Sequence, residues 1–88
     1  MTHHSYHPRI AEFIGAKIRA RRLALRMSQG DVSLATAIGD GSISRYERGE
    51  HGCTMESLLL VARALRCDPG DFLPALGEIE GLLNFEVA

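Results

Sequence analysis

Met27–Gly49 reads MSQGDVSLATAIGDGSISRYERG, and its pattern predicts two short helices joined by a tight turn. Ser28 suits the N-cap of the first helix, expected over 29–37, because its hydroxyl can accept a backbone N–H that lacks a helical partner. Ile38 is expected to anchor the turn, and Gly39-Asp40-Gly41-Ser42 follows it. The small inner side of the first helix is predicted to comprise Val32, Ser33 and Ala35.

The second helix of the pair, expected over 40–48, has one buried face. Ile43, Tyr46 and Glu47 follow the i, i+3, i+4 spacing of such a face, and Gly49 suits a left-handed helix end. Two short helices with a tight turn and a polar second helix are what a helix-turn-helix needs to lay one helix in a DNA groove. The polar side chains left on its other faces are Ser42, Ser44, Arg45 and Arg48.

This segment resembles the Cro/repressor-type helix-turn-helix family, also called the xenobiotic-response-element family. The matching parts are Ser28-Gln29 at the start and Ile43–Gly49 at the end, at the family's spacing without insertion. Similarity continues over Ile14–Arg22, Thr54–Leu65 and Asp68–Leu73, so that it covers roughly residues 10–74. The resemblance implies an all-α, five-helix, lambda-repressor-like DNA-binding domain in which helices two and three form the helix-turn-helix.

The remaining helices are predicted around this pair. The first is expected from Pro8 to Leu25, and the fourth starts after its cap, Thr54, and runs until Arg66-Cys67. A short fifth helix should begin with Asp68 as cap and Pro69 in its first turn. We expect a flexible tail at 1–8, the DNA-binding domain at 9–74 and an extension at 75–88. The apolar positions of the first helix are Ile10, Phe13, Ile14, Ile18, Leu23 and Leu25. The residues expected to face inward are Leu58, Val61, Ala62 and Leu65 in the fourth helix and Phe72 and Leu73 in the fifth.

Charge is divided unevenly along the chain, whose net charge is −1. Residues 1–49 contain eight basic and four acidic side chains, a net +4, whereas residues 50–88 contain two basic and seven acidic ones, a net −5. Attraction to phosphate depends on local charge, so the basic half, which contains the helix-turn-helix, can dock on DNA. The alternative is that the arginines of the first helix form a solvated face.

The resemblance assigns DNA contacts to individual residues. Arg45 is the strongest candidate for reading a base, because a guanidinium can pair with O6 and N7 of guanine; the alternative is a phosphate contact or a solvated charge. The implied base contacts are Asp40, Gly41, Ser42 and Arg45. The implied phosphate contacts are Gln29, Ser44, Arg48 and Lys17, with Gln29 at a helix N-terminus.

Asp40 and Gly41 depart from the family pattern, which often has Gln and another polar side chain there. A carboxylate is repelled by phosphate, and glycine offers no side chain to a base. The alternative role is structural, with Asp40 capping the helix and Gly41 permitting close backbone approach. If Asp40 and Gly41 contact no base, specificity for the DNA sequence is modest or depends partly on DNA shape.

Arg22 and Glu47 stand at positions where related repressors form an ion pair between the first and third helices. We expect this pair to be architectural, fixing the recognition helix on its scaffold. Removing one partner of a buried pair strands the other charge, which costs about 3–5 kcal/mol.

Other functional classes find little support. His3, His4 and His7 with Cys53 could suggest a metal, but we expect no metal site and no cofactor. Cys53 and Cys67 are expected at opposite ends of the fourth helix, about 20 Å apart at its rise per residue, too far for a disulfide. No catalytic arrangement or membrane-spanning run is present, so we expect a cytoplasmic binding protein rather than an enzyme.

The extension at 75–88, ALGEIEGLLNFEVA, is too apolar for a disordered acidic tail. It could be one helical face or, through Leu83, Phe85 and Val87, a short strand; it could pack on its own domain or form a dimer on two half-sites. The dimerisation residues would be Leu76, Ile79, Leu82, Leu83 and Phe85. The leading hypothesis is therefore a homodimeric repressor of double-stranded DNA. The alternative is a protein-interaction module, such as an antitoxin that binds a partner protein through its acidic half.

Overall fold

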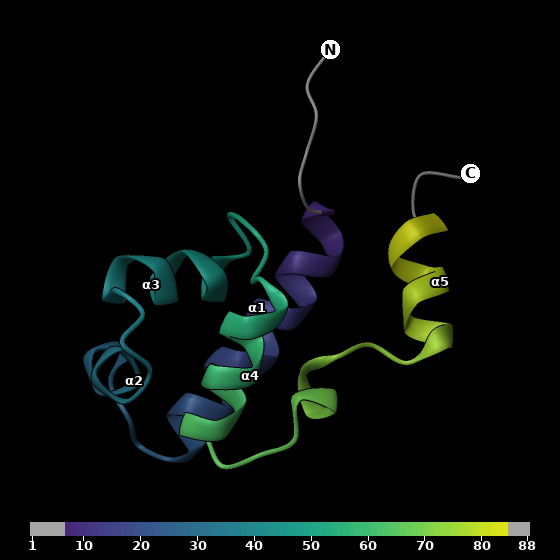
Figure 1. Ribbon diagram of the computed structural model, residues 1–88. Coiled ribbons are helices and arrows are strands. Elements are labelled where there is room, and N and C mark those ends of the chain that lie inside the picture. The colour runs from purple at the N-terminus through teal and green to yellow at the C-terminus, as the bar shows by residue number, and fades with distance from the viewer. Residues whose placement is uncertain (1–6, 85–88) are drawn as a thin grey trace.

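The computed structural model describes residues 7–84, and the regular structure in that range is helical throughout (Figure 1). Every helix predicted from the sequence is present, which confirms the all-α helix-turn-helix architecture. The short helix expected after Asp68 is a 3-10 helix, and the extension supplies a further α-helix. The elements are α1 (Pro8–Ala24), α2 (Gln29–Thr36), α3 (Asp40–Arg48), α4 (Met55–Ala64), the 3-10 helix η1 (Pro69–Phe72) and α5 (Leu76–Asn84).

Local capping sets where the helices begin. Ser28 Oγ accepts from the backbone N–H of Asp31 at 2.9 Å, and the Asp31 carboxylate accepts in return from the Ser28 N–H at 2.8 Å. This reciprocal capping box satisfies two donors that the helix itself leaves unpaired. Thr54 caps α4 in the predicted way, accepting from the Ser57 N–H at 3.1 Å. Most of the predicted N-terminal tail lies outside the described residues, but Pro8 already belongs to the first turn of α1.

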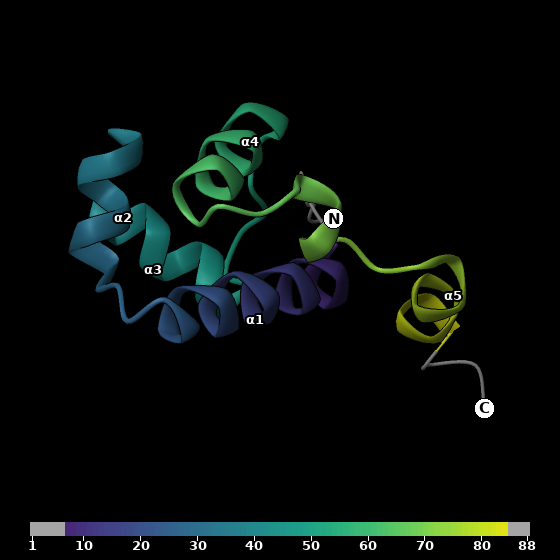
Figure 2. The same ribbon diagram turned by 90° about the horizontal axis from the view of Figure 1, so that it is seen from below.

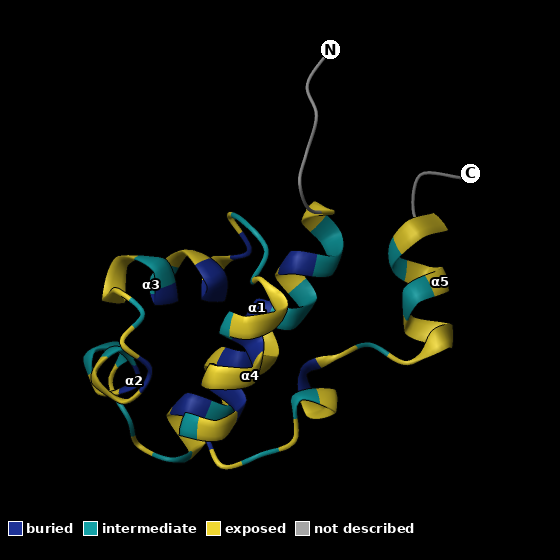
Figure 3. Cartoon of the chain, in the orientation of Figure 1, coloured by how far each residue is buried: buried dark blue, intermediate teal, exposed yellow. Residues whose placement is uncertain are grey.

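The core lies where α1, α2, α3, α4 and η1 face one another (Figure 3). The four inward residues predicted for α4 are all buried, as are Ile18 of α1 and Phe72 of η1. Dispersion and burial of these side chains hold the five elements as one unit. The buried cluster comprises Ile18, Val32, Ile43, Tyr46, Leu58, Val61, Ala62, Leu65 and Phe72.

Leu23, one of the apolar positions of α1, lies on the surface, and so do Leu73 and Ala35, which were predicted to face inward. Leu23 is 51% exposed because it follows buried Arg22 by one residue and points about 100° away from it. Leu73 is 46% exposed because the chain leaves η1 in an extended conformation. Ala35 is exposed, and Thr36 is buried in its place.

The turn between α2 and α3 contains a left-handed residue that is not a glycine. The left-handed residue is Ala37, with φ of 61°, whereas Gly39 has an ordinary φ of −59° and occupies the N-cap of α3. Asp40 is the first helical residue, so its suggested role as the cap is wrong. Buried Thr36 holds the turn, because its Oγ1 donates to the Val32 carbonyl at 2.8 Å and accepts from the Ile38 N–H at 3.1 Å.

Glycines allow α1 and α3 to approach closely. A Cβ added at Gly15 would stand 2.8 Å from the Glu47 carbonyl oxygen and would collide with that of Tyr46 as well. Gly49 ends α3 with φ of 70°, as predicted, and a Cβ there would stand 2.7 Å from Glu12 Cα. The backbone of α3 therefore lies directly on α1.

Helix α5 stands apart from this unit, beyond an extended link, and its contacts are with α1 (Figures 1 and 2). It has no buried residue. The helical reading of the extension is thus confirmed as far as Asn84; Phe85 and Val87 lie outside the described residues.

Candidate nucleic-acid interface

A buried ion pair fixes α3 on its scaffold. Arg22 Nε donates to Glu47 Oε2 at 2.6 Å, and Arg22 Nη2 donates to Glu47 Oε1 at 2.9 Å. The two side chains are only 9% and 2% exposed, so this bidentate pair is shielded from water. The hydrogen bond to Glu47 raises the pKa of Arg22 above its usual value, which keeps the guanidinium charged. The structure thus brings together the two residues expected to join the first and third helices.

The same ion pair also tethers the start of α2. Arg22 Nη1 donates to the Met27 carbonyl at 2.9 Å, and Gln29 Nε2 donates to Glu47 Oε1 at 3.1 Å. Gln29, the expected phosphate contact, therefore uses one amide N–H within the protein and keeps a second one. α1, α2 and α3 meet at this network.

The residues expected to read bases follow one another along the start of α3. Asp40 and Gly41 are exposed, and Ser42 is half-buried. Arg45 lies one turn further along and is also exposed, with its Nε donating to His51 Nε2 at 3.2 Å. His51, in the loop after α3, was not singled out from the sequence.

A hollow of about 370 Å³ lies beside this face, where α1, α2 and α3 meet. Three of the expected phosphate contacts, Gln29, Ser44 and Arg48, line it. Glu47 of α3 and Arg19 of α1 complete the lining, and Arg19 was not among the site residues expected from the sequence. Its spacing was the available signal: Arg19 is four residues after Gly15 and three before Arg22, on the side of α1 that meets α3.

Arg48 is held by a weak surface contact. Its Nε lies 2.8 Å from Glu50 Oε2, and both side chains are more than half exposed. Such an exposed pair is worth about 0–1 kcal/mol. Replacing this contact of Arg48 by a contact with an anionic ligand therefore costs little free energy.

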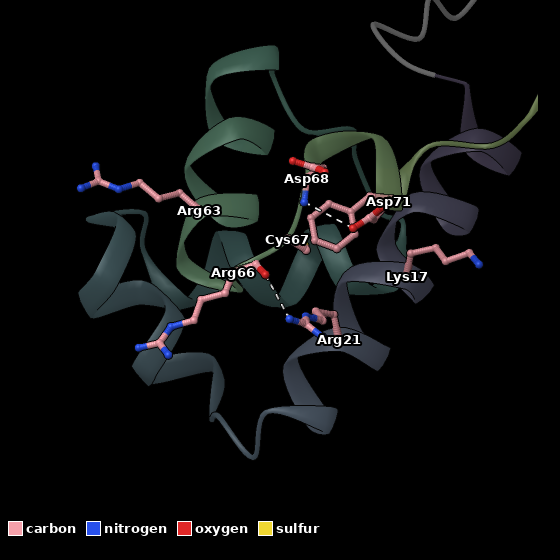
Figure 4. A pocket seen from close by; sticks show the side chains of 8 residues that line it. Lys17, Arg21, Arg63, Arg66, Cys67, Asp68 and Asp71 are labelled. Atoms are coloured by element: carbon pink, nitrogen blue, oxygen red, sulfur yellow. Dashed lines mark hydrogen bonds between the residues drawn. The ribbon is translucent and has the colours of Figure 1, made fainter.

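Lys17, the fourth expected phosphate contact, lies apart from the hollow. It lines a separate pocket of about 620 Å³, and its ammonium lies 5.4 Å from the Phe13 ring centroid. Figure 4 shows Lys17, Arg63 and Arg66 directed outward from this pocket, while Arg21 turns toward the Arg66 carbonyl. No residue of α2 or α3 contributes to the pocket, which is lined by Lys17, Arg21, Arg63, Arg66, Cys67, Asp68, Asp71 and Phe72.

The cysteines and histidines form no metal-binding group in the described part of the chain. Cys53 and Cys67 are both free thiols, and residues 7–84 contain no group of three or more His, Cys, Asp or Glu suited to hold a metal ion. Burial raises the pKa of the Cys53 thiol to about 11. His3 and His4 lie outside the described residues. Within residues 7–84, the helices are too short or too polar to cross a membrane.

Comparison with known proteins places this geometry among DNA-binding regulators. Residues 18–72 match a helix-turn-helix family. The chain is 36% identical over 62 residues to repressor protein C2 of Salmonella phage P22, covering 70% of this chain and 28% of that protein. It is 36% identical over 56 residues to the HTH-type transcriptional regulator DicA of Escherichia coli (strain K12), covering 64% of this chain and 42% of that protein.

A solved structure agrees with these matches. The P22 c2 repressor, in complex with the synthetic operator 9T, superposes with a TM-score of 0.66 at 34% identity over 69% of this chain and 92% of that chain. The two sequence relatives are much longer proteins, of which this chain spans less than half.

Proposed function

The chain belongs to the helix-turn-helix family of Cro/repressor type, and on that premise we propose that it is a transcriptional repressor that binds double-stranded DNA. In this proposal α3 enters the major groove. Its first turn and Arg45 meet base edges, while the residues around the hollow beside α3 meet phosphates.

The observation that carries the proposal is the placement of α3. The Arg22–Glu47 pair and the contact at Gly15 lock one face of α3 on the scaffold. Its opposite side presents exposed Arg45 and Arg48. A rigid helix with a polar outer face is suited to groove binding, because the reading side chains are held in register.

Phosphate contacts are assigned to the residues around the hollow. Gln29 keeps one free amide N–H at the N-terminus of α2, where the helix dipole favours an anion. Ser44 and Arg48 lie on the same side, and Arg19 takes the place expected for Lys17. Each neutralised phosphate steepens the fall of affinity with salt.

A homodimer would present two copies of α3 to two half-sites one helical turn apart. Helix α5 is the proposed interface, since Leu76 is 73% and Leu83 46% exposed. Ile79 and Leu82 are only half-buried by the chain itself. Phe85, also assigned to this interface, lies outside the described residues.

An interaction module of the antitoxin type is the less favoured alternative. The described residues offer a reading helix that such a role does not need, and the similar proteins named above are DNA-binding regulators. A protein partner therefore forms no part of the proposal.

The test is a mobility-shift titration across a salt series, using DNA from upstream of the chain's own gene. We expect binding that prefers this DNA and weakens steeply between 50 and 200 mM salt, by about 10³-fold or more if six or more phosphates are contacted. Arg45→Ala should lose the preference, whereas Arg63→Ala, an exposed arginine on α4, should retain it. Absence of binding at low salt would reject the proposal.

The dimer is tested separately by sedimentation equilibrium. Leu76→Glu with Leu83→Glu should give monomers, because two charges would have to be buried in the interface. Leu59→Glu, on the exposed side of α4, is the matched control and should leave the mass unchanged. An undiminished dimer in the double variant would exclude α5 as the main interface.

A further inference from the structure

The guanidinium of Arg45 is constrained at both of its edges. On one side its Nε donates to His51 Nε2 at 3.2 Å. On the other, Nη1 and Nη2 lie over Gly41, 3.7 and 3.8 Å from the point where a Cβ would stand. The group therefore lies across the first turn of α3 and is not simply extended into solvent.

Two further contacts fix the His51 ring so that its Nε2 can accept from Arg45. A neutral imidazole that accepts a hydrogen bond at Nε2 carries its proton on Nδ1. Nδ1 lies 3.4 Å from the Gly52 carbonyl oxygen, which can accept a hydrogen bond from this N–H. The ring of Tyr46 packs edge-on against the imidazole, with centroids 5.1 Å apart. Tyr46 is buried, so the ring of His51 rests on a fixed surface.

We propose that His51 and Gly41 position Arg45 to read a single guanine through its two terminal nitrogens. The inference rests on the proposed function and adds the residues that set its specificity. With Nε engaged by His51, the donors left for O6 and N7 of guanine are those on Nη1 and Nη2. Holding a flexible side chain in its bound orientation removes part of the entropy cost of binding.

Gly41 leaves the space in which the Arg45 guanidinium lies. The helix start lacks a side chain at the place where the guanidinium lies, and a Cβ alone would make only ordinary contact there. Any longer side chain would compete with the guanidinium for the same space. The glycine that looks like a missing base contact thus makes room for Arg45.

The experiment is selection from a random-sequence duplex library with the full chain and its variants. Wild type should enrich sites that contain one strongly preferred guanine in each half-site. His51→Phe keeps a ring beside Tyr46 but cannot accept a hydrogen bond, and should reduce preference for that guanine at least about fivefold, since a bidentate pair carries this discrimination. His51→Gln retains an acceptor and should keep most of the preference.

Gly41 supplies an independent pair of variants. Gly41→Leu should displace the guanidinium and lose the same guanine preference, whereas Gly41→Ala should retain it. Thermal melts establish that each variant is folded. If His51→Phe does not fold, the two Gly41 variants test whether Arg45 is positioned over the first turn of α3.

The outcomes separate the two proposals. Equal guanine preference in wild type and in folded His51→Phe, or equal loss in His51→Phe and His51→Gln, would overturn the positioning role while DNA binding stands. Failure of wild type to enrich any sequence would overturn both.

Discussion

Arg22 and Glu47 are joined by two hydrogen bonds, of 2.6 and 2.9 Å, across the interface between α1 and α3. The Glu47 carboxylate accepts a third from Gln29 of α2. Because both charges are almost completely shielded from water, each depends on the other for compensation. This carboxylate therefore links α3 to both α1 and α2.

Glu47→Ala is expected to destabilise the fold by about 3–5 kcal/mol, because it leaves a buried guanidinium without its counter-charge. Urea unfolding followed by circular dichroism measures the change. The double variant Arg22→Met, Glu47→Leu should recover most of the loss, because it removes both charges. Equal stability of Glu47→Ala and the parent would contradict this account of the pair.

Gly15→Ala should also be destabilising, by about 1–3 kcal/mol as for other overpacked sites. The added methyl group meets backbone oxygens of α3, which cannot rotate away as a side chain could. Gly77→Ala, on α5, is the control, because a Cβ there meets nothing within 4 Å. Thermal melts should rank Gly15→Ala below the parent and Gly77→Ala at or above it; the reverse order would show that α1 and α3 do not touch here.

Ala37→Gly should stabilise the chain, which is unusual for a glycine substitution. Ala37 has φ of 61°, and the left-handed conformation costs a non-glycine residue about 1–2 kcal/mol. Ala35→Gly, two residues earlier on the exposed side of α2, should destabilise by about 1 kcal/mol through its lower helix propensity. Opposite shifts in the urea midpoint are expected, and equal losses in the two variants would contradict the turn geometry.

Cys53 should be slow to react with thiol reagents in the folded protein. Burial raises its pKa from 9.0 to about 11, so at pH 8 only about one molecule in a thousand carries the reactive thiolate. Burial raises the pKa of Cys67 too, but Arg21 nearby opposes that effect. Alkylation followed by peptide mass analysis should find Cys67 modified before Cys53 in the folded protein. In urea, the two thiols should react at the same rate. Equal reactivity of Cys53 with and without urea would exclude its burial.

Much of the fold follows from local signals in the sequence. Ser28 and Thr54 are caps whose chemistry is complete within four residues, and the buried face of α3 is set by helical spacing, so both could be predicted. The left-handed conformation of Ala37 could not be predicted, because it is imposed by Thr36 and by the packing of α2 against α3. The exposure of Leu23 and Leu73 likewise depends on how elements distant in sequence meet.

The candidate site divides in the same way. Arg22, Glu47 and Arg45 stand at positions that a known family makes recognisable. His51 enters through tertiary geometry, because it lies in a loop that folds back toward Arg45. Arg19 had only its helical spacing as a signal, and the packing of α1 against α3 brings it to the hollow. The resemblance implies a phosphate contact for Lys17, which lines a pocket beside η1; that contact stays a prediction.

Dimethyl sulfate footprinting tests the central claim, that α3 reads the major groove through Arg45. The reagent methylates N7 of guanine in the major groove and N3 of adenine in the minor groove. On the tightest-binding duplex we expect protection of one guanine N7 in each half-site, lost in Arg45→Ala and retained in Arg63→Ala, with adenine N3 unchanged. Binding that leaves every guanine N7 as reactive as in free DNA would contradict the account.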